Sequence, residues 1–136
     1  VLAEHWHKIE KVAFGGHSEL WHAVLAEPVA DYKRGLDCWQ EKTIHSVAGQ
    51  ELVLITYPGV FTYGDVDEGT RLLLEHVPLL PRGARVHDFG CGGGVITAWL
   101  KLRQPDLVVS ASDISALAFA ATKATLKANK LTDIVL

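Results

Sequence analysis

The sequence predicts an α/β fold, in which residues 83–136 form the N-terminal βαβαβ half of a doubly wound parallel sheet. Two observations predict this class. Short apolar runs alternate with segments of helical length, and the runs contain few polar residues, as in strands that helices cover on both faces. In addition, four glycines fall within five positions after the first run, where doubly wound sheets bind their ligands.

The elements of this half follow in order along the chain. The first strand reads RVHDF, and the glycine stretch leads into a helix that runs to about Arg103, because Pro105 cannot continue it. The second strand reads LVVSAS, and a long helix follows over about residues 115–128. Asn129 is expected to end that helix in the left-handed conformation, and the terminal TDIVL reads as a third strand.

Two antiparallel pairs are predicted before this half. Residues 6–13 and 20–25 alternate in character on either side of a glycine-containing turn, which indicates a β-hairpin. A connector with a helical turn follows. The segments TIHSVAG and QELVLITY then form a second hairpin around Gly49.

A glycine-rich loop, PGVFTYGDVDEG, joins the second hairpin to a helix that begins near TRLLLEHV. Asp67 or Thr70 can cap this helix, because a side-chain oxygen at that place accepts hydrogen bonds from free backbone N–H groups. Pro78 and Pro81 end it.

Composition excludes several classes of function. The chain has 136 residues, of which 49% are hydrophobic and 21% charged, and its formal charge of −3 does not favour general electrostatic binding of nucleic acid or acidic membranes. No uncharged stretch reaches the roughly 18 residues that a membrane-spanning helix needs. Cys38 and Cys91 fit neither a metal motif nor a disulfide framework. We therefore expect a soluble cytoplasmic protein without a metal site.

The glycine stretch GCGGG, residues 90–94, is either a flexible hinge or a bed for a ligand. A dinucleotide fingerprint needs a small sixth residue, and Val95 or Thr97 falls there instead. What fits is an acid, Asp88, two residues before GxGxG. A carboxylate would repel a pyrophosphate at this place, but it suits the sulfonium and ammonium groups of S-adenosylmethionine.

A second acid closes the second strand. Asp113 lies 19 residues beyond Gly94, a place from which a carboxylate reaches ribose hydroxyls. It can equally cap the following helix, and capping does not exclude ribose binding. Cys91 is interpreted as a small filler of the turn. His87 is unusual, because a polar side chain in a strand buried on both faces needs a hydrogen-bond partner.

The segments YPGVFTYGDVDEGTRLLLEHV, RVHDFGCGGGVI and SDISALAFAATKATLKAN resemble the bacterial ribosomal RNA guanine-N2 methyltransferases, most of all the small-subunit enzyme. The similarity covers about residues 57–130. It implies a Rossmann-like class I methyltransferase fold, S-adenosylmethionine as cofactor, and ribosomal RNA or the small ribosomal subunit as partner. The implied reaction is methyl transfer to the exocyclic N2 amine of a guanine.

The family has two methyltransferase-like domains in tandem, of which the second is catalytic. The resemblance therefore implies that residues 1–27 are the terminal hairpin of the first domain, that 28–50 are a connector, and that 51–136 are the N-terminal part of the catalytic domain. A free-standing N-terminal hairpin extension is the alternative. On the first interpretation the chain is a fragment that spans both domains.

By position, the resemblance also implies a cofactor site. The turn around the methionine part of the cofactor comprises Asp88, Gly90, Cys91, Gly92 and Gly94. Asp113 falls on the ribose acid, and Ile114 lies beside the adenine. The residues of the preceding loop that cover or border the cofactor are Phe61, Asp67, Gly69 and Thr70.

No catalytic residue is expected within these 136 residues. The family's Asn-Pro-Pro-aromatic signature follows the fourth strand, and this sequence stops during the third. Three alternatives stay open: methylation of an adenine or of a protein glutamine, a non-catalytic copy that binds RNA or protein, and an oxidoreductase, which Val95 disfavours.

Overall fold

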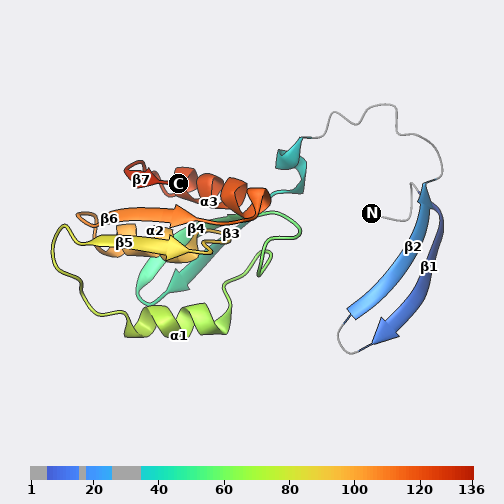
Figure 1. The fold of residues 1–136 in the computed structure, drawn as a ribbon, viewed down its shortest axis with the longest axis horizontal. Coiled ribbons are helices and arrows are strands. Elements are labelled where there is room, and N and C mark those ends of the chain that lie inside the picture. The colour runs from blue at the N-terminus through green and yellow to red at the C-terminus, as the bar shows by residue number, and fades with distance from the viewer. Residues whose placement is uncertain (1–5, 16–17, 26–34) are drawn as a thin grey trace. The chain divides into compact units, whose positions relative to one another are not determined.

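The structure is a computed structural model that describes residues 6–15, 18–25 and 35–136. The chain divides into two compact units, Val1–Gly35 and Leu36–Leu136. The ribbons of both units are drawn in Figure 1, and each unit is described by itself below. In the part of the chain that the structure describes, no helix has the length and apolar character needed to cross a membrane.

The first unit contains a β-hairpin. Strand β1 (Trp6–Gly15) pairs antiparallel with β2 (Ser18–Leu25), which confirms the predicted pair. The turn residues 16–17 and most of the predicted connector, residues 26–34, lie outside the described residues. The exposed large apolar side chains of the hairpin include Ile9, Val12, Leu20, Trp21 and Val24. A two-stranded hairpin is marginally stable alone in water.

The second unit starts with a short 3-10 turn, η2 (Leu36–Trp39), and the second predicted hairpin. Strand β3 (Glu41–Val47) pairs antiparallel with β4 (Gln50–Thr56). The turn between them is formed by Ala48 and Gly49, whose φ angles of 43° and 79° are both positive, as a tight two-residue hairpin turn requires.

The βαβαβ half is confirmed. Its helices and strands are β5 (Arg85–Phe89), α2 (Val95–Arg103), β6 (Val108–Ser112), α3 (Ala116–Ala128) and β7 (Ile134–Val135). The strands form a parallel sheet in the order β5-β6-β7. Helix α1 (Glu68–His76) precedes this half, and Asp67, one of the two predicted caps, is its N-cap.

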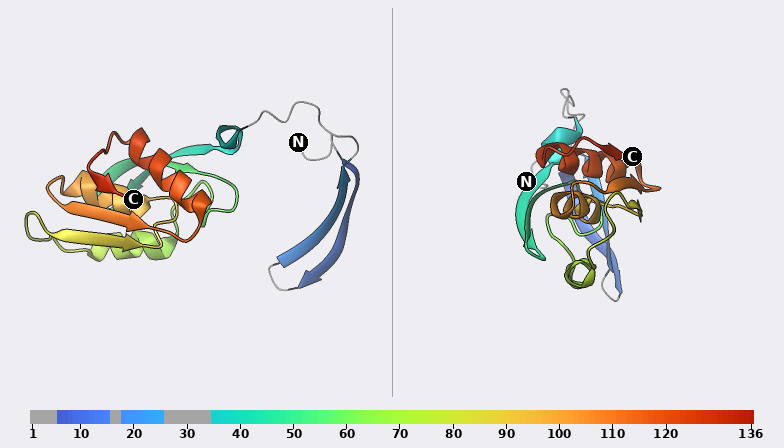
Figure 2. Two further views of the ribbon diagram at one scale, coloured as in Figure 1. Left: turned by 45° about the horizontal axis from the view of Figure 1, so that its top comes forward. Right: turned by 90° about the vertical axis from the view of Figure 1, so that its left-hand side faces the viewer.

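The core of this unit lies between the β3–β4 hairpin and the parallel sheet, with α2 in the middle layer (Figures 1 and 2). Trp99 of α2 is fully buried there, and its Nε1–H donates to the carbonyl oxygen of Val47 over 2.9 Å. The buried residues of this cluster are Val47, Leu52, Leu54, Val66, Leu74, Val95, Trp99, Leu100, Leu107 and Val109.

Within the described residues, the helices of this half cover one face of the parallel sheet. One face packs on α2, where Asp88 and Val109 are buried, whereas Phe89 on the other face is 89% exposed. The reason is topological. Parallel crossovers are right-handed, and because β5, β6 and β7 follow one another in a single direction across the sheet, both crossover helices fall on the same side.

The predicted left-handed end of α3 is also displaced. Asn129 is the C-cap but has a φ of −91°, and Lys130 takes the left-handed conformation at 58°. The Asn129 side chain instead binds β4, where its Oδ1 accepts from the Val53 N–H (2.9 Å) and its Nδ2 donates to the Val53 carbonyl (2.6 Å). One turn earlier, the Thr125 hydroxyl binds both backbone groups of Ile55. Helix α3 therefore satisfies polar groups along β4.

Candidate functional site

A cavity of about 360 Å³ lies where β5 and β6 end, which is the ligand-binding end of a parallel sheet. The loop that precedes α1 and the start of α1 form one wall, with Gly59, Val60, Phe61, Thr62, Val66, Asp67 and Thr70. The opposite wall is made by the glycine turn and the starts of α2 and α3, with Gly90, Cys91, Gly92, Gly93, Val95, Ile96, Asp113, Ser115 and Ala118. This volume is within the usual range for small-molecule sites.

The glycine turn is a compact backbone structure and not a loose hinge. The N–H groups of Gly90 and Cys91 both donate to the carbonyl oxygen of Ser112, over 2.8 and 3.0 Å. Gly90, Gly92 and Gly94 have φ angles of 81°, 54° and 81°, a region in which residues with a Cβ are strained. The hydrogen bonds to Ser112 attach this bare backbone to the end of β6.

The glycines of the turn serve different purposes. A Cβ added to Gly90 or Gly92 would meet no heavy atom within 4 Å, so these residues leave open space. A Cβ on Gly94 would lie 3.0 Å from the Cα of Thr122 in α3. Gly94 therefore allows close packing of the turn against α3, and it is not among the residues that line the cavity.

Asp88 is buried and faces the start of α2. Its Oδ2 accepts hydrogen bonds from the backbone N–H of Thr97 (3.1 Å) and from the Thr97 hydroxyl (2.5 Å). The residue before the helix, Gly94, has no side chain to cap it. Asp88 thus supplies an acceptor that the first turn of α2 otherwise lacks, and it does not line the cavity.

Asp113 lines the cavity and connects its parts. Its Oδ1 accepts from the Ser115 N–H and its Oδ2 from the Gly92 N–H, both over 2.9 Å. These two backbone hydrogen bonds lower the pKa of Asp113 below its ordinary value, so the carboxylate is charged at neutral pH. The N-cap of α3 is Ser115, so the Asp113 carboxylate joins the glycine turn to the start of α3.

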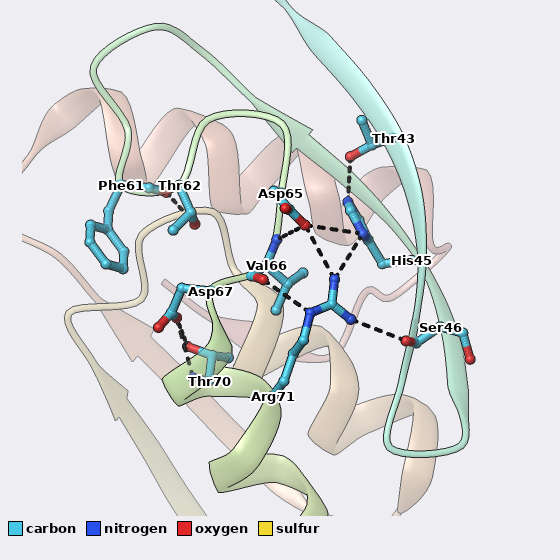
Figure 3. A network of polar contacts seen from close by, with 10 residues as sticks. All are labelled: Thr43, His45, Ser46, Phe61, Thr62, Asp65, Val66, Asp67, Thr70 and Arg71. Carbon is cyan, nitrogen blue, oxygen red and sulfur yellow. Dashed lines mark hydrogen bonds and ion pairs between the residues drawn. The ribbon is translucent and has the colours of Figure 1, made fainter.

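Asp67 stands on the opposite wall, at the N-terminus of α1 (Figure 3). Its carboxylate accepts from the Gly69 N–H (3.0 Å), the Thr70 N–H (3.3 Å) and the Thr70 hydroxyl. The hydroxyl of Thr70 and the two backbone N–H groups lower the pKa of Asp67. Phe61 lies on the same wall and is 74% exposed.

The structure brings together seven of the residues that the sequence predicted. Those that line the cavity are Phe61, Asp67, Thr70, Gly90, Cys91, Gly92 and Asp113. Asp88 and Gly94 lie behind the turn, as described above, and Ile114 is fully exposed beside Asp113. Gly69 faces a shallow hollow on α1 that Leu72, Leu73 and His76 also line.

Sequence reasoning missed several lining residues. The glycine-rich loop itself was the signal for Gly59, Val60, Thr62 and Val66, since a whole loop next to a ligand contributes more than its polar residues. Ser115 and Ala118 could have been found as the start of the helix that follows the second acid, because that helix begins at the end of the second strand.

Cys91 and His87 have structural partners. Burial raises the pKa of the Cys91 thiol, and its sulfur lies 3.2 Å from the Thr122 hydroxyl, which agrees with its interpretation as a filler of the turn. The ring nitrogens of His87 bind the hydroxyls of Ser110 and Ser112, each over 2.9 Å, on the exposed face of the sheet. Within residues 6–15, 18–25 and 35–136, no group of three or more side chains could hold a metal ion.

The arrangement is that of a binding site for a polar, partly cationic molecule. Two acidic residues, Asp67 and Asp113, line the cavity, one on each wall, and the open space over Gly90 and Gly92 admits a ligand close to the backbone. Carboxylates in such places accept hydrogen bonds from hydroxyls and attract positive charge.

Comparison with known proteins gives a consistent picture. Residues 51–136 match the family model described as the methyltransferase small domain. The chain is 36% identical over 131 residues to "Ribosomal RNA small subunit methyltransferase C" of Psychromonas ingrahamii, an alignment that covers 96% of this chain and 37% of the relative. It is 50% identical over 86 residues to the protein of the same name in Pseudoalteromonas translucida, covering 63% of this chain and 25% of the relative.

Among solved structures, the chain is similar to the "16S rRNA N2 G1207 methyltransferase (RsmC) in complex with AdoMet and Guanosine" of T. thermophilus. The TM-score is 0.66 at 25% sequence identity, and the match covers 95% of this chain and 34% of that chain. This chain thus spans between a quarter and 37% of the length of these relatives.

Proposed function

Because the chain belongs to the methyltransferase small domain family, we propose that it is part of an enzyme that transfers a methyl group from S-adenosylmethionine to the N2 amine of a guanine in small-subunit ribosomal RNA. The observation that carries this proposal is the cavity between the glycine turn and the loop before α1, with Asp113 at its wall. The names of the relatives support the substrate class.

The residues present fit the cofactor. The Asp113 carboxylate is charged and keeps acceptor capacity beyond its two backbone hydrogen bonds, so it can bind ribose hydroxyls. Gly90 and Gly92 leave the backbone open for the methionine part, and we propose that Ile114, which is fully exposed next to Asp113, contacts the adenine. When bound, the cofactor supplies an electrophilic methyl group.

The loop wall contributes a cover for the same ligand. Phe61 provides an apolar surface, and Asp67 with Thr70 presents a charged edge to a cationic sulfonium or ammonium group. Gly69 belongs to this edge through its N–H group, which holds the Asp67 carboxylate. We assign Asp88 and Gly94 to the shape of the turn, since they hold it against α2 and α3.

The target amine needs groups that this chain does not supply. The Asn-Pro-Pro-aromatic signature does not occur in its sequence, and we assign the binding of the guanine to other parts of the protein. The 136 residues alone are therefore expected to bind cofactor in part and to transfer little methyl.

For the first unit, we propose that residues 1–27 are the terminal hairpin of a preceding methyltransferase-like domain. The predicted connector, residues 28–50, includes β3 and the β3–β4 turn, which belong to the second unit, so we assign the connecting role only to the residues before Leu36. The exposed apolar residues of the hairpin support this proposal, since such a hairpin requires a sheet or helix to cover it. Ribosomal RNA as substrate would place the enzyme in the cytoplasm.

A methyl-transfer assay tests the proposal. The full-length protein is incubated with labelled S-adenosylmethionine and small-subunit ribosomal RNA or intact subunits, and digested nucleosides are analysed. We expect labelled N2-methylguanosine. Label in adenosine or in a protein glutamine would show that the enzyme is a methyltransferase with a different substrate, and would overturn the guanine assignment. No transfer to any RNA or protein would contradict the proposal as a whole.

A further inference from the structure

The loop wall of the cavity, residues 58–67, has no regular secondary structure to hold it in place. Within it, the Asp65 N–H donates to the Thr62 carbonyl (3.1 Å), and its first part is tied to the preceding chain by Val60 N–H to the Tyr57 carbonyl (3.0 Å) and Gly64 N–H to the Thr56 hydroxyl (2.8 Å). Thr62 has a φ of 54°, which is costly for a residue with a Cβ. A loop of this kind keeps one conformation only when groups outside it hold it.

Arg71, on α1, provides such contacts (Figure 3). Its Nε donates to the Val66 carbonyl oxygen over 3.1 Å, and one terminal nitrogen donates to Oδ1 of Asp65 over 3.2 Å. Both acceptors belong to the last part of the loop wall. The guanidinium thus binds the loop through the backbone and through a side chain at once.

The same guanidinium also reaches the β3–β4 hairpin. One terminal nitrogen donates to the carbonyl oxygen of Ser46 (3.3 Å), and the other lies 3.3 Å from Nδ1 of His45. Nδ1 of His45 also lies 3.6 Å from Oδ1 of Asp65, and Nε2 of that ring lies 2.8 Å from the Thr43 hydroxyl. The planar fork of donors is what allows one side chain to bind four groups.

Charge reinforces this network. The Val66 N–H and the Arg71 guanidinium hold the pKa of Asp65 below its ordinary value, so the carboxylate is charged at neutral pH. The Asp65 side chain is 71% exposed, and an exposed ion pair contributes little by itself. The hydrogen bonds from Arg71 to the backbone carbonyl oxygens of Val66 and Ser46 therefore hold the loop wall in place.

The network touches the cavity indirectly. Val66 and Thr70 line the cavity, and Arg71 follows Thr70 on α1 without lining it. A shift of the Val66 carbonyl would move Val66 and Asp67, two lining residues, together. Arg71 thus joins the loop wall of the cavity to the β3–β4 hairpin.

We propose that Arg71 is a positioning residue whose guanidinium clamps the loop wall, residues 58–67, to the β3–β4 hairpin and so preforms the cofactor cavity. This inference rests on the proposed function, because it names the cofactor as the ligand of the cavity. If the loop wall held its binding conformation in only a tenth of the molecules, the apparent Kd would rise about 10-fold.

The test compares Arg71→Met with Arg82→Met in the full-length protein. Methionine keeps helix propensity and length without the donors. Arg82 is a matched control because its Nε forms an exposed ion pair with Asp106 over 3.3 Å, outside the cavity. Amide hydrogen exchange is followed over residues 59–66 without cofactor, and S-adenosylmethionine affinity is measured by calorimetry.

We expect Arg71→Met to accelerate exchange in the loop wall and to raise the Kd for S-adenosylmethionine about 10-fold, and Arg82→Met to change neither. In turnover, the KM for the cofactor should rise while kcat at saturating cofactor stays the same. Unchanged exchange, or faster exchange with an unchanged Kd, would overturn the proposal.

Arg71→Lys serves if the methionine variant does not fold, since it keeps the charge but not the fork and is expected to show the same changes more weakly. A wild-type protein that binds no S-adenosylmethionine would refute the proposed function, and the positioning role with it. Binding by the wild type that Arg71→Met and Arg71→Lys leave unchanged would refute the positioning role alone.

Discussion

Asp67 and Asp113 stand on opposite walls of the cavity, and N–H groups next to them in the fold hold each one. This arrangement fixes the direction of the carboxylates before any ligand arrives. A preformed acceptor loses little freedom when a hydroxyl or a cation binds it.

Asp113→Ala tests the ribose contact directly. Charge-assisted hydrogen bonds contribute about 1.5 to 3 kcal/mol each, so the variant is expected to raise the Kd for S-adenosylmethionine roughly 10-fold to 150-fold. Calorimetry on the full-length protein measures it. Asp106→Ala, outside the cavity, is the control, and an unchanged Kd in Asp113→Ala would remove Asp113 from the site.

Three hydrogen-bonded carboxylates, those of Asp65, Asp67 and Asp113, predict that the fold loses stability in acid. The pKa values of Asp65, Asp67 and Asp113 are all lowered from 3.8 in the folded chain. A group with a depressed folded pKa stabilises the fold above its unfolded pKa, and this contribution is lost as pH falls through the folded value. We expect the free energy of unfolding to decline below pH 3.8, and less steeply in Asp113→Ala. An equally steep decline in Asp113→Ala would show that the Asp113 carboxylate does not stabilise the fold.

Two glycines with the same φ separate conformation from packing. Gly90→Ala introduces only the strain of a positive φ, because its Cβ would meet open space, whereas Gly94→Ala also places a Cβ 3.0 Å from Thr122 Cα. Overpacking costs about 1 to 3 kcal/mol, so Gly94→Ala should be less stable than Gly90→Ala by about that amount in urea denaturation. An equal loss of unfolding free energy in both variants would mean that α3 can shift away from the glycine turn at no cost.

At the scale of elements, side chains of α3 and its C-cap hydrogen-bond the backbone of β4, as the backbone of a neighbouring strand would. Asn129 and Thr125 lie one helical turn apart, and each binds both backbone groups of one β4 residue, Val53 and Ile55. These four hydrogen bonds, called the α3–β4 seam below, position α3. Ser115 and Ala118, at the start of this helix, line the cavity.

Asn129→Ala is expected to destabilise the second unit by about 1 to 3 kcal/mol, because it leaves the Val53 N–H and carbonyl without their partner. Denaturant unfolding of the full-length protein, followed by a probe in this unit, measures the loss. Lys123→Ala, an exposed change on the same helix, should have little effect. A loss no greater than that of the control would show that the seam is dispensable.

The sequence predicted elements better than the contacts between them. Apolar runs and the proline and glycine positions located β5, α2, β6 and α3, because these are local signals. The role of Asn129 could not be predicted, since its partner Val53 is 76 residues away. Asp88 was expected at the cofactor, but its partner is Thr97, and no periodicity shows which way a buried carboxylate turns.

At the scale of the whole molecule, the order β5-β6-β7 explains both the site and the open face of the sheet. A single direction of strand order places α2 and α3 on one side. Because β5 and β6 are parallel, the glycine turn and the start of α3 lie at the same end of the sheet and form one wall of the cavity. The other wall comes from the loop before α1. Its glycines were visible in the sequence, whereas its clamp by Arg71 depends on a hairpin 25 residues earlier in the chain.

The central claim is that S-adenosylmethionine binds between these two walls. Hydrogen exchange of the full-length protein, with and without saturating S-adenosylmethionine, tests it most directly. The account predicts slower exchange in both walls together, at residues 59–66 and at residues 90–96. Binding that leaves both segments unchanged, or that protects only segments elsewhere in the chain, would contradict it.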